Sequence, residues 1–268
     1  MRLDLFLYTN GYTESRRKAQ MLIADGGVFI GGKQILKPAY EVPEGVTPQI
    51  CGDVMPYVGR GGYKLERALD AFDIHPKDYI CVDIGASTGG FTDCLLQRGA
   101  AHVYAVDSGS NQLAEKLRCD SRVTVMEQFN AKNLTLADVG GLCDICVCDV
   151  SFISLTYIFE PVTRILKPYH AETGCGSFVA LIKPQFEAGR DSIGKNGIVR
   201  DKKVYQRVIS SLIQRAALVG LYCMSVIPSP ILGGDGNHEF LAQFAHGTPE
   251  MANPLLFDKT VLNQIINA

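Results

Sequence analysis

The sequence has almost no net charge, no long hydrophobic run and no apolar segment at its start. Its 268 residues include 26 Lys and Arg against 28 Asp and Glu, a formal net charge of −2, which excludes a histone-like polycation. A bilayer-spanning helix needs ~20 consecutive apolar residues, and no run approaches that length, so we do not expect an integral membrane protein. The nine Cys, an odd number without a signal segment, argue against a secreted disulfide scaffold. We expect a cytoplasmic protein with reduced thiols.

The composition is typical of a folded chain, with 47% hydrophobic and 20% charged residues. Its length predicts about two domains. The first 40 residues differ from the rest, because six basic residues stand against three acidic ones, a local balance of +3. Ser15 can cap a helix there, Gly31-Gly32 can turn a hairpin, and prolines between 37 and 56 indicate a connector. The expected elements are a helix over 16–24 ended by Gly26-Gly27, strands over 28–30 and 34–36, and a flexible basic joint at 59–62.

Later residues alternate between strands and helices. Apolar, β-branched runs are typical of parallel strands that are buried on both faces. The expected strands are 79–84, 101–107, 122–127, 144–150, 178–182, 222–227 and 239–245, and the expected helices are 64–72, 92–98, 153–166 and 203–218. We predict a doubly wound, mostly parallel seven-stranded α/β sheet of Rossmann-like type, preceded by a small α+β domain. The expected domains are 1–58 (small domain and connector), 59–248 (the α/β domain) and 249–268 (a tail).

A glycine-rich loop, Asp83 to Phe91, directly follows the first strand of this sheet. Glycines at a strand-to-helix turn let backbone N–H groups approach a ligand closely. The spacing Gly85-x-x-x-Gly89 lacks the G-x-G-x-x-G phosphate fingerprint. Asp107 ends the next strand, where a carboxylate can bind both hydroxyls of a ribose. This pattern favours S-adenosylmethionine, with a nicotinamide cofactor and a tight structural turn as the alternatives.

Four ionisable residues are predicted at the carboxyl end of the sheet, where ligands bind in this architecture. Asp149 and Lys183 follow the fourth and fifth strands, and Lys64 stands before the glycine loop. Glu239 begins the last strand, and it lies at the same edge if that strand runs antiparallel. A Lys beside a sugar hydroxyl can stabilise the developing alkoxide or accept its proton. Carboxylates can hold each Lys in place and tune it. The set therefore favours a reaction on a weakly acidic nucleophile.

Several motifs resemble known families. Those similar to the small RNA-binding domain named after the fourth small-subunit ribosomal protein are Arg2-Leu3-Asp4, Ser15–Gln20, Gly26-Gly27-Val28 and Lys37-Pro38. Those similar to the FtsJ-like ribose methyltransferases are Arg60–Leu65, Asp83–Phe91, Asp149–Ser154 and Lys183–Glu187. Joined in this order, the two resemble the TlyA family, also called haemolysin A-like proteins, over nearly the whole chain.

The resemblance implies S-adenosylmethionine-dependent 2′-O-methylation of ribose in ribosomal RNA, usually at cytidine. Because the sequence has no lipid-spanning element, we expect no membrane partner. The resemblance also implies a catalytic tetrad of Lys64, Asp149, Lys183 and Glu239. Contacts with the methyl donor would fall on Asp83, Gly85, Ser87, Gly89, Phe91, Asp107 and Asn130. Contacts with RNA phosphates are expected from the basic residues Arg2, Arg16, Arg17, Lys18, Lys33, Lys37 and Arg60. The chain departs from the family at Gly59, where Ser is common, and at Lys132, where Arg is common.

Other readings of the sequence are weaker. Cys143, Cys146 and Cys148 fall in a buried strand without a second Cys pair or a nearby His, so no metal site is expected. Ser151 lacks a nucleophile elbow, which argues against a hydrolase. Two other functions stay open: a membrane-active cytolysin, as the haemolysin name suggests, and an RNA-binding protein with a vestigial methyltransferase domain.

Overall fold

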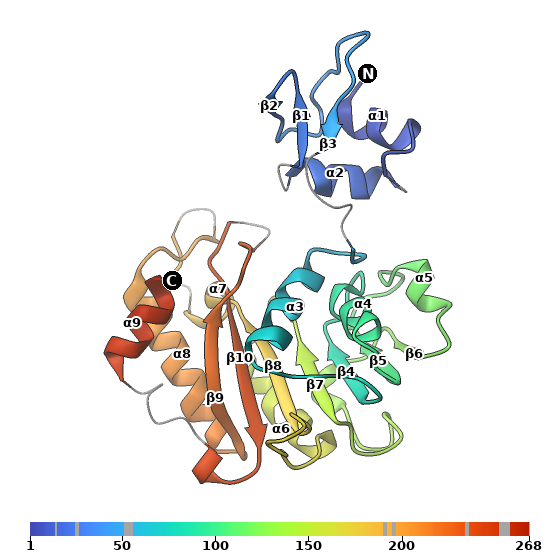
Figure 1. Ribbon diagram of the computed structural model, residues 1–268. Coiled ribbons are helices and arrows are strands. Elements are labelled where there is room, and N and C mark those ends of the chain that lie inside the picture. The colour runs from blue at the N-terminus through green and yellow to red at the C-terminus, as the bar shows by residue number, and fades with distance from the viewer. Residues whose placement is uncertain are drawn as a thin grey trace. The chain divides into compact units, whose positions relative to one another are not determined.

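The computed structural model divides the chain into two units, Met1–Pro56 and Tyr57–Ala268. It describes residues 1–13, 15–24, 27–50, 56–189, 192–194, 197–233, 236–251 and 258–267. Gly26 of the predicted helix end and residues 51–55 of the predicted connector lie outside the described residues. Figure 1 shows the elements of both units.

The N-terminal unit packs two helices beside a three-stranded antiparallel sheet (Figure 1). The elements are α1 (Leu3–Thr9), α2 (Arg16–Ala24), β1 (Val28–Ile30), β2 (Lys33–Gln34) and β3 (Gln49–Ile50), with the strands in the order β2-β1-β3. Its core consists of Leu3, Leu7, Ala19, Ile23, Val28, Ile30, Ile35 and Val42. The unit therefore has a hydrophobic core of its own.

Most of the elements predicted here are confirmed. Helix α2 has the predicted bounds, and its cap is present because Ser15 Oγ accepts a hydrogen bond from the Lys18 N–H at 3.2 Å. The hairpin turns at Gly31 and Gly32, whose φ angles of 56° and 77° favour glycine. Its second strand spans Lys33–Gln34 instead of the predicted 34–36, and the side chain of Ile35 is buried in the core. Helix α1 and strand β3 were not predicted.

The C-terminal unit is built on the predicted seven-stranded sheet, with the order β6-β5-β4-β7-β8-β10-β9. Strands β4 to β8 pair in parallel, and β10 runs antiparallel to both β8 and β9. The strands are β4 (Ile80–Ile84), β5 (His102–Val106), β6 (Val123–Met126), β7 (Ile145–Cys148), β8 (Ser177–Ile182), β9 (Leu221–Pro228) and β10 (Phe240–His246). The fold class and each predicted strand of this unit are confirmed.

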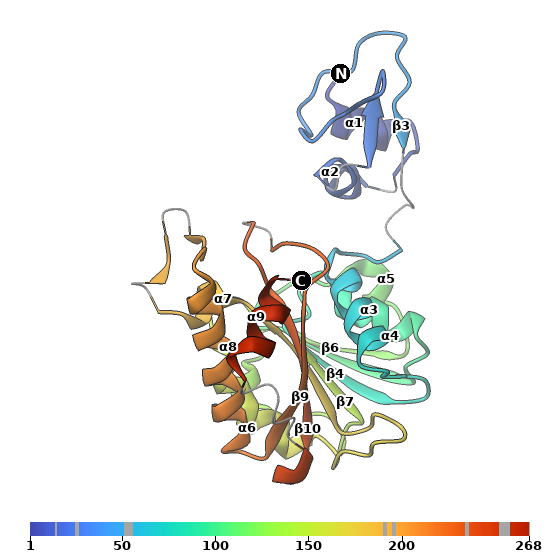
Figure 2. The same ribbon diagram turned by 60° about the vertical axis from the view of Figure 1, so that its left-hand side comes forward.

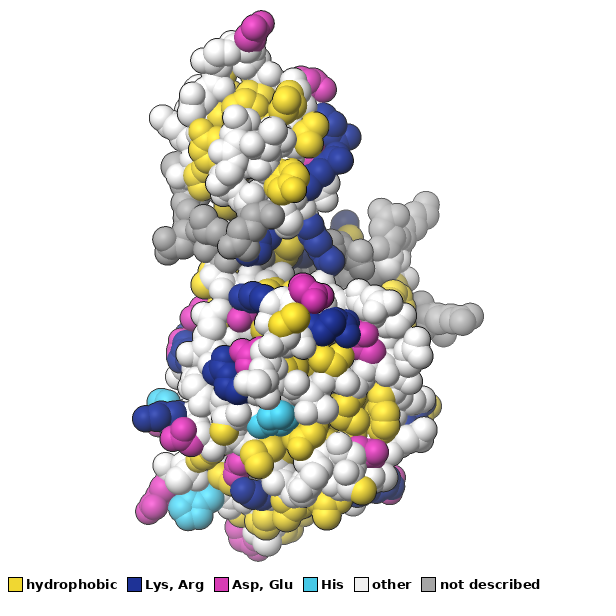
Figure 3. Space-filling view, turned by 90° about the vertical axis from the view of Figure 1, so that its right-hand side faces the viewer, with side chains coloured by type: hydrophobic (Ala, Val, Ile, Leu, Met, Phe, Trp, Pro, Cys, Tyr) yellow, Lys and Arg dark blue, Asp and Glu magenta, His cyan; other side chains and the backbone are white. Residues whose placement is uncertain are grey.

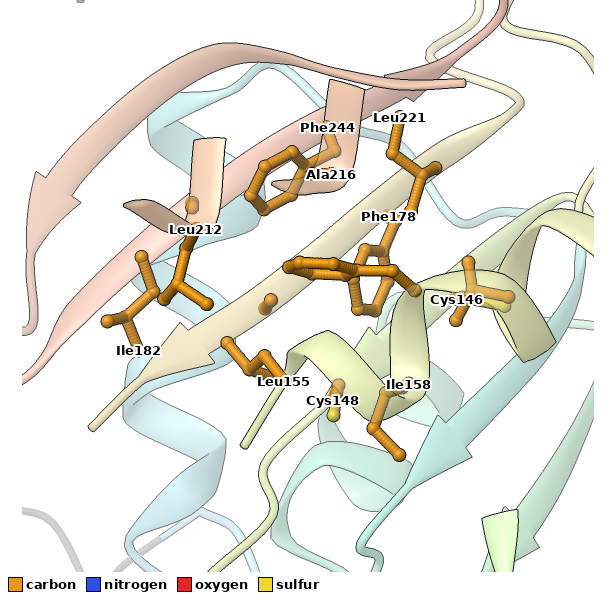
Figure 4. Close-up of a cluster of buried hydrophobic side chains, with 14 of the residues drawn as sticks. Cys146, Cys148, Leu155, Ile158, Phe178, Ile182, Leu212, Ala216, Leu221 and Phe244 are labelled. Atoms are coloured by element: carbon orange, nitrogen blue, oxygen red, sulfur yellow. The ribbon is translucent and has the colours of Figure 1, made fainter. Parts of the chain in front are cut away.

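Helices cover both faces of this sheet (Figure 2). On β8, Phe178, Ala180 and Ile182 belong to the core under one set of helices, while Val179 and Leu181 belong to the other core. Figure 4 shows part of the first core, in which the rings of Phe178 and Phe244 stack with centroids 5.9 Å apart. The first set is α6 (Thr156–Ile165), α8 (Lys202–Ala217) and α9 (Lys259–Asn267), and the second is α3 (Gly61–Ala71), α4 (Gly90–Gln97) and α5 (Glu115–Arg118).

The predicted flexible joint at 59–62 is wrong, because these residues form the tightly packed start of α3. A Cβ at Gly62 would lie 2.2 Å from the Tyr57 ring, and one at Gly59 would lie 2.8 Å from Thr88 Oγ1. A Cβ at Gly90 would approach the Gly61 Cα to 3.2 Å. Glycine therefore brings α3 into close contact with the glycine-rich loop.

Several short elements carried no recognisable signal. They are α5, α7 (Pro184–Glu187) and the 3₁₀ turns η1 (Ala131–Asn133) and η4 (Pro249–Met251). Helix α9 lies in the predicted tail and packs against α8, where Gln206 Nε2 donates to Asn263 Oδ1 at 2.5 Å. Among the described helices, none is both long and apolar enough to cross a membrane.

The three cysteines around β7 lie in the core. Cys143, Cys146 and Cys148 are fully buried, and the Sγ atoms of Cys143 and Cys146 are 3.4 Å apart. No group of three or more metal-ligating side chains is found within the described part of the chain. Here the thiols pack as small hydrophobic groups.

Candidate active site

Four elements bring polar side chains to the carboxyl edge of the sheet. Asp149 directly follows β7, and its N–H donates to the carbonyl of Ile84 at 2.9 Å. Phe240 at the start of β10 pairs with Ile182 at the end of β8. Glu239 and Lys183, each one residue beyond that pair, therefore lie at the same edge.

Lys183 is held beside Asp149. Its Nζ lies 2.5 Å from Asp149 Oδ1 and donates a hydrogen bond to Ser151 Oγ at 2.9 Å. Both partners of Lys183 come from the short segment that follows β7. The ammonium group thus has a fixed position between a carboxylate and a hydroxyl.

Lys64 and Glu239 form a second, buried ion pair. The two side chains come from α3 and from the segment before β10, with Nζ and Oε2 2.6 Å apart. Lys64 is 8% exposed and Glu239 4%. Because water reaches neither charge freely, each is stabilised by the opposite charge of its partner. A Cβ at Gly61, one helical turn before Lys64, would lie 3.9 Å from Asp149 Oδ2. The structure therefore brings all four predicted tetrad residues to one edge as two ion pairs.

The glycine-rich loop closes over the ends of β4 and β5. Gly85 has φ 86°, and a Cβ on it would lie 2.5 Å from the carbonyl oxygen of Asp149, so only glycine fits. The N–H groups of Gly85 and Ala86 both donate to the carbonyl of Val106, at 2.8 and 3.1 Å. The Ser87 N–H donates to Asp107 Oδ2 at 2.8 Å. The loop is thus tied to the residue predicted to bind a ribose.

Two adjoining cavities open at this loop. The larger, of about 310 Å³, extends from Asp107 to Asp149, which is within the size range of small-molecule sites. The smaller, of about 170 Å³, extends from the loop to Lys183. The two share Gly85, Ser87, Asp149 and Ser151 as lining residues. Two ligands, one in each cavity, would therefore meet beside Asp149.

The predicted donor contacts do not all reach these cavities. Gly85, Ser87, Asp107 and Asn130 line the larger cavity, and Phe91 lines the smaller. Gly89 lines neither, because a Cβ on it would lie 2.2 Å from Leu117 Cδ1. Its φ of 94° lets the chain enter α4, so it supports the loop rather than lining a cavity.

Asp83 is buried beneath the loop and lines neither cavity. Its Oδ2 accepts a hydrogen bond from Thr92 Oγ1 at 2.7 Å, while Oδ1 has no hydrogen-bond partner among the described residues. The pKa of Asp83 is raised to about 7, mainly by burial, with smaller contributions from the charges of Asp149 and Asp107 and an opposing one from the Thr92 hydrogen bonds. A cation at the loop would favour the charged carboxylate.

Asn130 and Lys132 face different surroundings. Asn130 Oδ1 accepts from the Lys132 N–H at 3.1 Å, which begins η1 and leaves Asn130 on the cavity wall. Lys132 Nζ lies 4.0 Å from the centroid of the Tyr157 ring on α6. The residue that departs from the family pattern therefore contacts a helix and does not line the cavity.

Sequence reasoning missed several residues of the site. Glu127, directly after β6, accepts backbone hydrogen bonds from Asn111, Gln112 and Leu113. These bonds, that from Asn111 above all, and a hydrogen bond from Arg118 lower its pKa to about 2. Glu127 thereby positions the loop that supplies Gln112 to the larger cavity. Phe152 is 90% exposed, yet it lines the same cavity. Glu127 could have been found from the sequence, because it is a carboxylate at the end of a predicted strand, as Asp107 is.

The basic candidates of the N-terminal unit are organised around Asp4. This carboxylate is buried and accepts hydrogen bonds from Arg2 Nε at 3.1 Å, Arg16 Nε at 2.9 Å and Gln20 Nε2 at 2.8 Å. Although burial raises the pKa of Asp4, these hydrogen bonds bring it well below its ordinary value. Figure 3 shows Lys and Arg side chains along one edge of the unit. Arg17, Lys33 and Lys37 are exposed and Lys18 is half-buried, while Arg60 belongs to the other unit, at the start of α3.

Comparison with known families identifies both units. The FtsJ-like methyltransferase family matches residues 57–245, and the S4 domain matches residues 1–47. The chain belongs to the FtsJ-like methyltransferase family. It is an enzyme of the S-adenosylmethionine-dependent methyltransferase class, with an S4 domain at its N-terminus.

Relatives of this FtsJ-like methyltransferase carry two kinds of name. It is 41% identical over 244 residues to the 16S/23S rRNA (cytidine-2'-O)-methyltransferase TlyA of Mycobacterium tuberculosis, covering 89% of this chain and 87% of that protein. It is 42% identical over 245 residues to Hemolysin A of Brachyspira hyodysenteriae, covering 91% and 99%. A solved structure of a hemolysin-named protein from Streptococcus thermophilus matches with TM-score 0.77 and 40% identity, over 100% and 94% of the two chains. The predicted resemblance to the TlyA family is confirmed.

Proposed function

We propose that this methyltransferase transfers a methyl group to the 2′-hydroxyl of a ribose in ribosomal RNA, at cytidine. The observation that carries the proposal is the position of Lys183, fixed by Asp149 and Ser151 on the wall of the smaller of two adjoining cavities. A relative named as an rRNA (cytidine-2'-O)-methyltransferase supports the substrate. Because the proposed substrate is ribosomal RNA, we place the reaction in the cytoplasm.

The residues around the larger cavity fit S-adenosylmethionine. When bound, this group supplies an electrophilic methyl group on a sulfonium. Asp107 has both oxygens bonded to backbone N–H groups, of Ser87 and Gly109, and each oxygen keeps a lone pair for a ribose hydroxyl. The unpartnered Oδ1 of Asp83 would supply negative charge beneath an ammonium group. Asn130 would lie on the adenine side, while Gly85 and Gly89 shape the loop.

The tetrad would act on the RNA hydroxyl. Lys183 would accept the 2′-hydroxyl proton as the oxygen forms its bond to the methyl group and the methyl–sulfur bond breaks. The resulting ammonium group would stabilise negative charge on the oxygen. Asp149 positions Lys183 through the 2.5 Å contact. The buried Lys64–Glu239 pair completes the polar wall. Alignment of the oxygen with the methyl group supplies much of the remaining acceleration.

The S4 domain would bind structured RNA through phosphates. Asp4 holds Arg2 and Arg16 in fixed orientations, so these guanidinium groups are presented with little further loss of side-chain entropy. The remaining proposed phosphate contacts are Arg17, Lys18, Lys33, Lys37 and, in the catalytic unit, Arg60. We assign residues 1–58 to RNA binding and connection, 59–248 to catalysis and 249–268 to a tail.

The proposal is tested by incubating the full chain with S-adenosylmethionine and ribosomal subunits, then mapping modified nucleosides by nuclease digestion and mass spectrometry. We expect one extra methyl group on a cytidine ribose. A reaction without the donor is the control. Methylation of a base, or no methylation of either subunit or of free rRNA, would contradict the proposal. Binding of S-adenosylmethionine by calorimetry separates an active enzyme from a vestigial domain.

A further inference from the structure

A third cavity, of about 730 Å³, reaches the residues on either side of Glu239 in the sequence and has no role in the function proposed above. Five segments of the C-terminal unit line it: α3, residues 198–202, residues 228–232, the start of β10 and the end of α9. Figures 1 and 2 show α9 beside α8 and β9. The cavity is therefore formed by segments that are distant in sequence.

Its walls are held by buried polar contacts. Asn237 is 1% exposed, and its side chain accepts a hydrogen bond from the Val199 N–H at 3.0 Å and donates to the Gly197 carbonyl at 3.1 Å. Tyr205 Oη donates to the Val199 carbonyl at 2.5 Å. The Ser229 N–H donates to the carbonyl of Glu239 at 2.9 Å. Two loops are thus fixed to each other and to the residue that precedes β10.

The lining combines positive charge with an apolar wall. Arg67, Arg200 and Lys202 line the cavity, and no acidic residue is found among the lining residues that the structure describes. Lys202 Nζ donates a hydrogen bond to Asn267 Oδ1, a neutral acceptor. The apolar wall is formed by Ile198, Pro230, Ile231 and Leu232. Cations beside an apolar wall suit a phosphate ester joined to a flat, hydrophobic base.

The cavity begins next to the catalytic groups. Arg67 follows Lys64 by three residues on α3, so the two side chains lie on the same side of the helix. His238 and Phe240, both in the lining, flank Glu239. In RNA the 3′-phosphate is attached to the ring carbon next to the one that bears the 2′-hydroxyl. A 2′-hydroxyl at Lys183 therefore requires a phosphate close by.

We propose that this cavity binds the RNA strand next to the methylated ribose, with phosphates contacting Arg67, Arg200 and Lys202 and a neighbouring base against the apolar wall. The inference rests on the proposed function and adds a strand-binding site within the catalytic unit. With this site, the catalytic unit would bind single-stranded RNA independently of the S4 domain.

The test replaces the three cations together, as R67Q/R200Q/K202Q in the full chain. We expect KM for ribosomal RNA to rise by about tenfold or more, with kcat and the affinity for S-adenosylmethionine nearly unchanged. The slope of log KM against log salt concentration should fall by about 2, since each contact with single-stranded RNA contributes about 0.7. Unchanged binding of S-adenosylmethionine shows that the variant is folded. Arg67→Lys with Arg200→Lys should keep most of the wild-type KM.

The matched control is K77Q/R122Q/R164Q, which removes the same charge at residues that line none of the three described cavities. Its salt slope should equal that of the wild type. A triple variant with wild-type KM and salt slope overturns the strand-binding site while the proposed activity stands. A wild-type protein that methylates no RNA overturns the proposed function and this site with it.

Discussion

The two ends of strand β7 carry the same pair of residue types in different surroundings. Asp144 precedes the strand and lies 2.6 Å from Lys167 Nζ, while Asp149 follows it and lies 2.5 Å from Lys183 Nζ. At the first end, Asp144 also accepts hydrogen bonds from the Ile80 N–H at 2.9 Å and from Cys175 Sγ at 3.4 Å. At the second end, Asp149 and Lys183 line cavities.

This difference shows that position in the sheet, not residue type, makes a Lys–Asp pair available for chemistry. The Asp144 pair joins β4, β7 and the segments after α6, and the hydrogen bond to Asp144 raises the pKa of Lys167. The Asp149 pair lies where the chain leaves parallel strands through the tight turn at Gly85. In open α/β sheets the crevice at the carboxyl ends receives ligands. The predictions below compare the two ends.

The largest expected effect comes from removing the two lysines separately. Lys183→Ala should lower kcat for methyl transfer by about 10³-fold or more, because the group that stabilises the 2′-oxygen is lost. Lys167→Ala should retain most of the activity, since its pair lies at the opposite end of β7. Incorporation of labelled methyl groups into ribosomal subunits measures both. Equal activity in the two variants would remove Lys183 from the mechanism.

The next comparison concerns folding stability. Lys64→Met leaves the buried Glu239 carboxylate without its partner and should lower the free energy of unfolding by ~3–5 kcal/mol. Lys167→Met should cost about 1 kcal/mol, because the Lys167 side chain is 41% exposed and water can reach the pair. Urea denaturation followed by circular dichroism measures both. If Lys64→Met lowers the free energy of unfolding by no more than Lys167→Met does, water reaches the Lys64–Glu239 pair, which contradicts the burial seen in the structure.

A third comparison uses pH. Burial raises the pKa of Asp83 to about 7, so part of this carboxyl is protonated below that pH. A bound ammonium group favours the charged form, so binding of S-adenosylmethionine releases a proton, and affinity should rise with pH up to about 7 and then level off. Asp83→Asn should weaken binding at pH 8 by about tenfold and remove the pH dependence. A tenfold loss is expected if the bound ammonium group lowers the pKa of Asp83 by about one unit, since one unit corresponds to a factor of ten in affinity.

Calorimetry at pH 6 in buffers of different ionisation enthalpy measures the released proton. Asp144→Asn, at the other end of β7, is the control and should leave the affinity and its pH dependence unchanged. If affinity falls as pH rises from 6 to 7, the bound group does not place a cation over Asp83, and the orientation assigned to the donor is wrong.

The strands could be predicted from the sequence, whereas the loops and long-range contacts around the site could not. β7 and β8 are buried on both faces, so their apolar runs were recognisable, and the residues that follow them, Asp149 and Lys183, could be placed at one edge. Glu239, at the start of the last strand, and Lys64, before the glycine loop, could also be placed near this edge. Their 2.6 Å contact joins residues 175 positions apart and depends on α3 packing, which no local pattern encodes.

The loops were the part that could not be predicted. The third cavity depends on Asn237, which fixes the segment at 197–199 through its side chain. Such contacts have no periodicity. Gly89 lines neither cavity at the loop, and a glycine needed for its φ of 94° and its close approach to Leu117 resembles, in sequence, one needed for a ligand. Helix α1 is a seven-residue segment, too short for a clear helical repeat.

The smallest expected effect concerns two exposed hydrophobic side chains near the ends of β7. Phe152, 90% exposed, lies in the larger cavity wall with its ring centroid 4.9 Å from that of Phe186, and an RNA base can stack on it. Phe152→Ala should raise KM for RNA about fivefold, the lower end of the ~1–3 kcal/mol measured for stacking, with unchanged stability. Leu142→Ala removes a side chain that is 43% exposed before Asp144 and should not change KM. If KM for RNA rises in both variants, RNA binding depends on exposed apolar area in general and not on the position of Phe152 at the carboxyl edge of the sheet.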